Sequence, residues 1–161
     1  MTNRIRPGIR KKTIFLFLTA GLLFALFVFG SDSSNGEVVV EMTQSGFATS
    51  TVHIRQGDAV VFHNSSDVLR WPATNEHPTH TEYPNSDARK CGTISESLIL
   101  DSCAPLSKGE NYPFRFDEAG VWHVHDHLSP DACLSVTVEA LEGYRKPMSH
   151  LVISALADSI R

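Results

Sequence analysis

Apolar side chains recur at every second position in several short segments of the chain. Successive side chains of an extended strand point to opposite faces, so this period predicts strands with one buried face. Gly, Asn and Asp separate the segments, which is typical of turns between strands. The alternation covers residues 38–42, 52–54, 60–62, 112–116, 122–124 and 134–138. It predicts an all-β domain built as a β-sandwich.

Residues 69–110 interrupt this pattern. They hold four of the eight prolines and two of the three cysteines, with little regular period. A connection of this length without regular structure is usually functional when it occurs in a compact domain. Within it, residues 71–80 are broken by Pro72 and Pro78 and are predicted to be a loop.

The N-terminus carries a different signal. Residues 14–29 are an almost unbroken apolar run, and residues 1–30 hold five Lys and Arg but no Asp or Glu. A basic flank of this kind stays in the cytoplasm while the chain that follows is exported. Residues 1–30 are therefore predicted to be a signal or anchor helix, with the membrane as its partner. No small-x-small cleavage site follows the run, which favours an uncleaved transmembrane anchor over a cleaved signal. The domain is then held at the cell surface or in the periplasm, and the alternative is secretion.

The chain after residue 30 has the size of one ordinary domain. We expect a linker over residues 31–36, the β-sandwich over residues 37–140 and a C-terminal extension over residues 141–161 with roughly helical spacing of apolar residues. This part carries 9 Lys and Arg against 18 Asp and Glu, so its formal charge is -9. So acidic a domain repels nucleic acid, and binding to DNA or RNA is not expected.

Five histidines fall into two clusters. His123, His125 and His127 alternate at the end of a predicted strand, so their imidazoles are expected on one side of it. His77 and His80 lie in the Pro-broken loop. If the loop folds over the strand end, the two clusters close a site in which imidazoles bind one metal ion. The candidate ligands are His77, His80, His125 and His127. The alternative is a hydrogen-bonded group of histidines that pins the loop to the sandwich.

Two cysteines lie in the same long connection. Cys91 and Cys103 are twelve residues apart, and an exported domain is in a compartment where disulfides form. We expect a bridge between them that shortens the loop and holds the segment of His77 and His80 in place. Cys133 is then left over.

Several segments together carry a resemblance to a known family. The pattern Gly-Asp-x-Val-x-Phe-x-Asn occupies residues 57–64, Gly-x-Trp-x-x-His occupies residues 120–125, and a closing strand follows at residues 134–138. With these segments, residues 37–140 resemble a cupredoxin. The resemblance implies a Greek-key β-sandwich that holds copper at one end, most often for electron transfer, with a redox protein as partner.

The sequence departs from the blue-copper pattern of that family. A blue site needs a cysteine thiolate between two histidines and a weak thioether ligand. Asp126 stands where the cysteine would follow His125, and no Met lies between Gly120 and Glu139. The sequence therefore predicts a mononuclear histidine site in place of a blue one, and His125-Asp126-His127 resembles the His-x-His pairs of multicopper oxidases. Imidazoles suit copper and also zinc, and copper binds more tightly where it is available. Asp126 is expected to be a ligand itself or an acceptor that orients an imidazole.

Three functions follow from these features. The leading hypothesis is an exported, membrane-tethered copper-binding protein that carries copper or electrons, which is not an enzyme. The second is a metal-free structural or interaction domain, and the third is a small copper oxidoreductase. A hydrolase is not supported, because no nucleophile with an adjacent base is recognisable.

Overall fold

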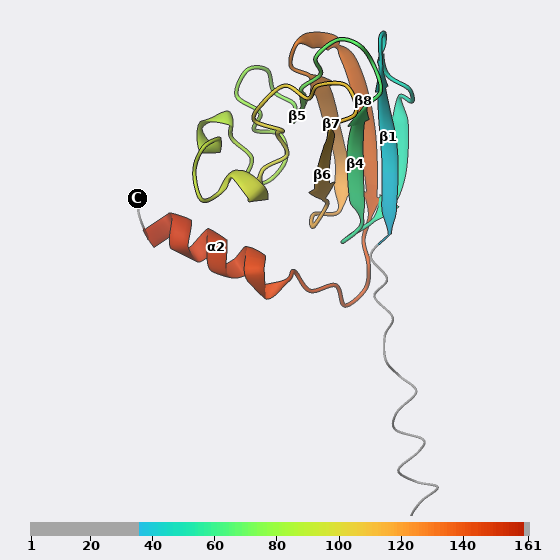
Figure 1. The fold of residues 1–161 in the computed structure, drawn as a ribbon. Coiled ribbons are helices and arrows are strands. Elements are labelled where there is room, and N and C mark those ends of the chain that lie inside the picture. The colour runs from blue at the N-terminus through green and yellow to red at the C-terminus, as the bar shows by residue number, and fades with distance from the viewer. Residues whose placement is uncertain (1–35, 160–161) are drawn as a thin grey trace, which may run out of the picture. The chain divides into compact units, whose positions relative to one another are not determined.

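The computed structural model describes residues 36–159, which form two four-stranded sheets and a C-terminal helix (Figure 1). One sheet has the strand order β2 (Gly46–Phe47), β1 (Glu37–Thr43), β4 (Ala59–Asn64) and β6 (Asn111–Arg115). The other has the order β3 (Thr51–Arg55), β8 (Ser129–Glu139), β7 (Gly120–Asp126) and β5 (Pro72–Thr74). Each sheet is mixed, because β1 pairs in parallel with β4, β3 pairs in parallel with β8, and the remaining pairs are antiparallel. The predicted all-β sandwich is confirmed.

The core lies between the sheets and uses the alternate residues that the sequence pattern picks out. Strand β4 shows the pattern clearly, since Val60 and Phe62 are fully buried while their neighbours along the strand are half-buried. Strand β8 does the same with Leu134, Val136 and Val138. Burial of such side chains is the main stabilising contribution, about 1.5–3 kcal/mol for each of them.

The sequence predicted that residues 71–80 are a loop, but part of this segment is a strand. Pro72, Ala73 and Thr74 form strand β5, which pairs antiparallel with β7 and is fully buried. Proline is tolerated there because β5 is an edge strand and Pro72 is its first residue. The strand fixes where the following histidine segment begins.

The predicted alternation of three histidines ends one residue early. Strand β7 stops at Asp126, and its pairing with β8 shifts register between His125 and Asp126. Such a register shift redirects the side chains that follow it. His127 therefore leaves the strand, and its position is set by the hydrogen bond from its amide N–H to the carbonyl of Trp71, at 2.7 Å.

The connection between β5 and β6, green to yellow in Figure 1, is fastened to the sandwich by Tyr83. It contains only the short 3₁₀ helices η1 (Ala88–Lys90) and η2 (Glu96–Leu98). The Tyr83 ring lies edge-on to the rings of Phe114 and Phe116, with centroids 5.1 and 5.5 Å away. Its hydroxyl accepts a hydrogen bond from the amide of Asp117 at 2.9 Å. The long segment is therefore ordered around a buried aromatic group.

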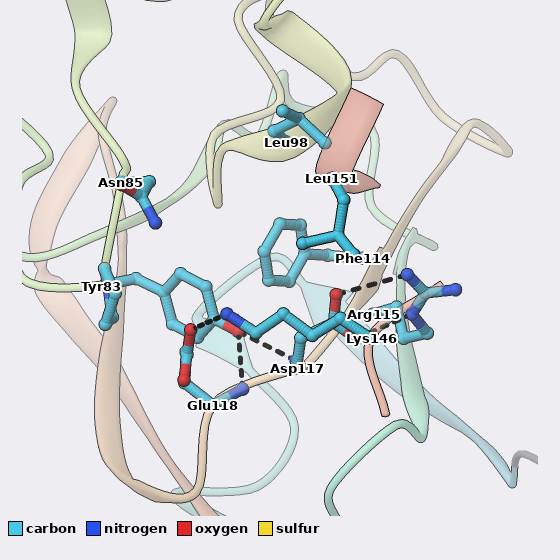
Figure 2. Close-up of a pocket in the computed structure, with 10 residues that line it drawn as sticks. Tyr83, Asn85, Leu98, Phe114, Arg115, Asp117, Glu118, Lys146 and Leu151 are labelled. Atoms are coloured by element: carbon cyan, nitrogen blue, oxygen red, sulfur yellow. Dashed lines mark hydrogen bonds and ion pairs between the residues drawn. The ribbon is translucent and has the colours of Figure 1, made fainter. Parts of the chain in front are cut away.

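The C-terminal extension forms helix α2 (Met148–Ser159). Figure 2 shows Leu151 of α2 beside a cavity of about 90 Å³ that Tyr83, Phe114 and Glu118 also line. The charged side chains there are paired, Arg115 with Asp117 and Lys146 with Glu118. Because these charged groups already have partners, the cavity is not a candidate site.

Residues 36–159 contain no helix that is both long enough and apolar enough to cross a membrane. The predicted signal or anchor helix, residues 1–30, lies outside the described residues.

A buried ion pair fixes the end of the sandwich where the histidines lie. Nη1 of Arg70 contacts Oδ2 of Asp126 at 2.7 Å, with side-chain exposures of 6% and 0%. Nη2 of Arg70 donates to the carbonyls of Thr43 and Gln44, both at 2.6 Å. The pair therefore ties the turn after β1 to the end of β7.

We predict that Asp126→Asn lowers the free energy of unfolding by about 3–5 kcal/mol, because it leaves the Arg70 charge buried without a counter-ion. Urea denaturation of the metal-free protein measures the loss. The matched control is Asp67→Asn, which breaks an exposed pair with Lys108 and should lower the free energy of unfolding far less, because water screens exposed ion pairs. Equal losses in the two variants would contradict the structural role of the pair.

Candidate metal centre

The two histidine clusters meet at the end of the second sheet. The segment after β5 turns back over β7, since the amide of Asn75 donates to the carbonyl of His123 at 3.0 Å. The amide of His80 then donates to the carbonyl of Glu76 at 2.6 Å, which closes a tight turn. His77 and His80 are thereby carried onto the end of β7, where His125 and His127 lie.

The four predicted ligands form one group of imidazoles. The ring of His77 lies 5.4 Å from that of His125 and 4.7 Å from that of His127, measured between centroids. The ring of His80 lies 5.1 and 4.8 Å from the same two rings. The structure thus brings together all four side chains that the sequence proposed as ligands.

His125 is buried and has a ring nitrogen without a hydrogen-bond partner among the described residues. The residue is 2% exposed, and its Nδ1 donates to Oδ1 of Asn75 at 3.1 Å. Its Nε2 is buried and has no hydrogen-bond partner among the described residues. Burial and the neighbouring imidazoles of His80, His77 and His127 lower the pKa of His125 to about 4. At neutral pH its Nε2 therefore carries a buried lone pair that accepts no hydrogen bond from the described residues.

His77 and His127 complete a set of three nitrogen atoms. One ring nitrogen from each of His77, His125 and His127 lies within 4.8 Å of the other two. Burial, and the imidazoles of His80 and His77, also lower the pKa of His127, which favours its metal-binding neutral form. Three imidazoles, one with a buried nitrogen that has no partner among the described residues, fit a copper or zinc ion chemically.

His80 is held differently from the other three histidines. Its Nδ1 lies 2.6 Å from Oδ2 of Asp101, and its Nε2 lies 2.9 Å from Nδ1 of His127. Asp101 also accepts hydrogen bonds from the indole N–H of Trp71 at 2.7 Å and from the amide of Cys103 at 2.8 Å. Burial alone would raise the pKa of Asp101, but the hydrogen bonds from His80, Trp71 and Cys103 outweigh it, so the pKa is lowered. Asp101 is therefore an ionised acceptor at neutral pH.

Other residues that the sequence placed near the site point elsewhere. His123 is exposed on β7 and bonds through Nδ1 to Oε1 of Glu82 at 2.6 Å. Asp126 contacts Arg70 and accepts from two backbone amides, those of Trp71 and Leu128, so both of its oxygens are engaged away from the imidazoles.

Cys133 is free and exposed. It is paired in register with His125, yet its sulfur lies 3.4 Å from the carbonyl oxygen of Pro130. Among the described residues, the nitrogen set of His77, His125 and His127 includes no sulfur atom.

The predicted disulfide between Cys91 and Cys103 is present. Because Cys103 donates to Asp101, the bridge ties the long connection to the residue that holds His80. Its cysteines are bonded to each other, so they are not metal ligands.

Sequence reasoning missed Asn75 and Asp101. Asn75 lies two residues before His77, and its role depends on the turn that places its amide against His125. Asp101 follows the short apolar group at residues 98–100, with no local motif around it. The isolated β-bridge between Ala73 and Asp101 brings it beside the histidines.

Neither family models nor curated protein sequences give a match to this chain. A novel purple cupredoxin from Nitrosopumilus maritimus is similar in structure, with 16% sequence identity and a TM-score of 0.48, over 63% of this chain and 99% of that one. A Cu(I) structure of an amicyanin mutant is similar at 21% identity and a TM-score of 0.48, over 67% of this chain and 87% of that one. In its fold the chain is similar to these cupredoxins. At these values the likeness describes the arrangement of strands alone.

The lowered pKa of His125 predicts a pH dependence of stability. In the unfolded chain His125 takes up a proton near its ordinary pKa of 6.5, whereas in the folded chain it stays neutral until pH falls to about 4. The unfolded state therefore binds more protons in this window, and the free energy of unfolding should fall as pH drops from about 6.5 to about 4.

Urea denaturation of the metal-free protein across this pH range measures the effect. His125→Gln should flatten the dependence relative to the wild type. Identical slopes for wild type and His125→Gln would show that His125 does not hold a depressed pKa.

Removal of the disulfide should weaken both the fold and the histidine group. We predict that the double variant Cys91→Ser, Cys103→Ser loses about 2–4 kcal/mol of unfolding free energy, because the unfolded chain is no longer constrained. Denaturation under non-reducing conditions gives this loss, and Cys133→Ser is the control that should leave stability unchanged. A double variant as stable as the control would mean that the bridge adds nothing to this connection.

Proposed function

We propose that this chain is a copper-binding protein whose His77, His125 and His127 hold one copper ion outside the cytoplasm. The observation that carries the proposal is the buried Nε2 of His125, which has no hydrogen-bond partner among the described residues and belongs to a set of three ring nitrogens. Leaving a buried polar atom unpaired costs about 1–3 kcal/mol. A bound metal ion removes that cost.

The three histidines differ in what they contribute. His125 is fixed by its strand and by Asn75, so its nitrogen is preoriented. His127 is half-buried and packs against the ring of Trp71, with centroids 4.7 Å apart. His77 is exposed and comes from the loop, so it is the ligand that connects the site to solvent.

The donor set decides which chemistry the site supports. When bound, copper supplies one-electron exchange between Cu(II) and Cu(I). Imidazole nitrogens without a thiolate suit Cu(II) well, so the potential should be lower than in a blue-copper site. The exposed edge at His77 gives a redox protein, or a carrier that delivers copper, access to the ion. Tethering through residues 14–29 would keep the domain at the outer face of a membrane.

A metal-free structural domain is the second candidate. It is favoured by the bonds that His80 and His125 already make to Asp101 and Asn75, which fasten the loop without any ion. In that case substitution of the histidines would lower stability and leave the metal content of the protein unchanged.

The test is titration of the whole chain, purified in mild detergent, with Cu(II). We predict binding of one ion per chain, read by paramagnetic resonance as nitrogen hyperfine structure, and loss of this binding in His125→Ala and His127→Ala. The matched control is His53→Ala, since His53 is exposed on β3 and lies outside the group. Equal copper binding by all four proteins would exclude the proposed site.

Visible absorption separates a histidine site from a thiolate site. We expect no intense charge-transfer band in the wild type, and an unchanged spectrum in Cys133→Ser. A strong band that disappears in Cys133→Ser would make this thiol a ligand and contradict the all-imidazole set. Competition with Zn(II) then ranks the two metals that the donor set can accept.

A further inference from the structure

We propose that His80 is a positioning residue of the metal centre, one that orients His127 through a hydrogen bond and is held in turn by Asp101. This inference rests on the proposed copper site, and it explains why His80 is not one of the three protein ligands. It changes the role that the sequence suggests for His80, which is that of a metal ligand.

The contact with Asp101 fixes one nitrogen of His80. Oδ1 of Asp101 receives the N–H groups of Trp71 and Cys103, at 2.7 and 2.8 Å, and Oδ2 faces Nδ1 of His80 at 2.6 Å. A carboxylate held by these donors is an acceptor. The proton between Asp101 and His80 therefore belongs to Nδ1 of His80.

The contact with His127 then uses the other nitrogen of His80. In a neutral imidazole with a proton on Nδ1, Nε2 is an acceptor. It lies 2.9 Å from Nδ1 of His127, so His127 donates to it and carries its own proton on Nδ1. The lone pair of His127 is consequently on Nε2, the nitrogen that remains free to bind a metal ion, and His80 has no lone pair left to offer.

The position of His80 supports the same role. His80 is 1% exposed, and it does not belong to the set of His77, His125 and His127 whose ligand atoms lie within 4.8 Å of one another. Its backbone has a φ of 55°, in the left-handed region that a side chain rarely adopts. Strained backbone of this kind persists where the surroundings fix it, commonly at functional sites. Here the Asp101 and His127 contacts are what fix it.

Hydrogen-bond partners behind a ligand imidazole set which nitrogen faces the metal, and their loss typically weakens metal affinity by about 10- to 100-fold. Two variants of His80 separate this role from ligation. Glutamine can donate to Asp101 and accept from His127, whereas leucine can do neither. We therefore expect His80→Leu to bind Cu(II) about 10- to 100-fold more weakly than wild type, and His80→Gln to recover most of that loss.

The experiment uses the whole chain in mild detergent with Cu(II) as the probe. Pulsed paramagnetic resonance counts the imidazoles on the ion, and we expect three in the wild type and three in His80→Gln. The matched control is His123→Gln, whose imidazole also bonds to a carboxylate at 2.6 Å but outside the group. It should change neither the count nor the affinity.

The outcomes distinguish this inference from the proposed function. Four imidazoles in the wild type and three in His80→Gln would overturn the positioning role and leave the copper site standing. A wild-type chain that binds no Cu(II) would overturn the copper site itself, and with it the role of His80. If the variants fail to fold, the count in the wild type still decides. Heteronuclear NMR of the metal-free chain adds an independent reading, since His80 and His127 should both be protonated at Nδ1, and a proton on Nε2 of His80 would contradict the inference.

Discussion

The buried carboxylate of Asp101 accepts hydrogen bonds from three separate segments of the chain. The donors are Trp71 just before β5, His80 in the turn after β5 and Cys103 in the disulfide. Such charge-assisted bonds are about twice as strong as those between neutral groups. Because few regular elements order residues 75–110, this carboxylate, together with Tyr83, gives the segment a defined position on the sandwich. These contacts help to hold His77 and His80 beside His125 and His127.

The sandwich contributes a rigid strand end and a second, separate charge pair. Arg70 and Asp126 neutralise each other beneath the site, so the imidazoles face no unpaired charge from that direction. Burial and the neighbouring imidazoles lower the pKa of His125, and Asn75 occupies its Nδ1. Nε2 of His125 is left without a hydrogen-bond partner among the described residues, and the imidazoles of His77 and His127 lie beside it. This combination of a fixed nitrogen and an exposed ligand suits the exchange of electrons or of copper that we propose for the site.

The sequence could predict the strands because their period of two is a direct result of a buried face and an exposed face. It could also predict which histidines meet, since His125 lies near the end of a strand with an apolar pattern and His77 lies in a segment broken by proline. It could not predict the strand at Pro72, because an edge position tolerates proline and only the sheet order reveals the edge. The partners Asn75 and Asp101 were out of reach as well, because their roles arise from contacts between residues 21 to 50 positions apart. The register shift after His125 likewise depends on pairing with β8, which no local pattern records.

The central claim is that the ligands of one copper ion are the imidazoles of His77, His125 and His127. The most direct measurement is a crystal structure of the copper-loaded chain with anomalous diffraction recorded on both sides of the copper absorption edge. The account predicts one anomalous peak, within bonding distance of a nitrogen of each of these three histidines, with His80 still hydrogen-bonded to Asp101. A peak bonded to Cys133, or no copper peak among these histidines, would contradict it.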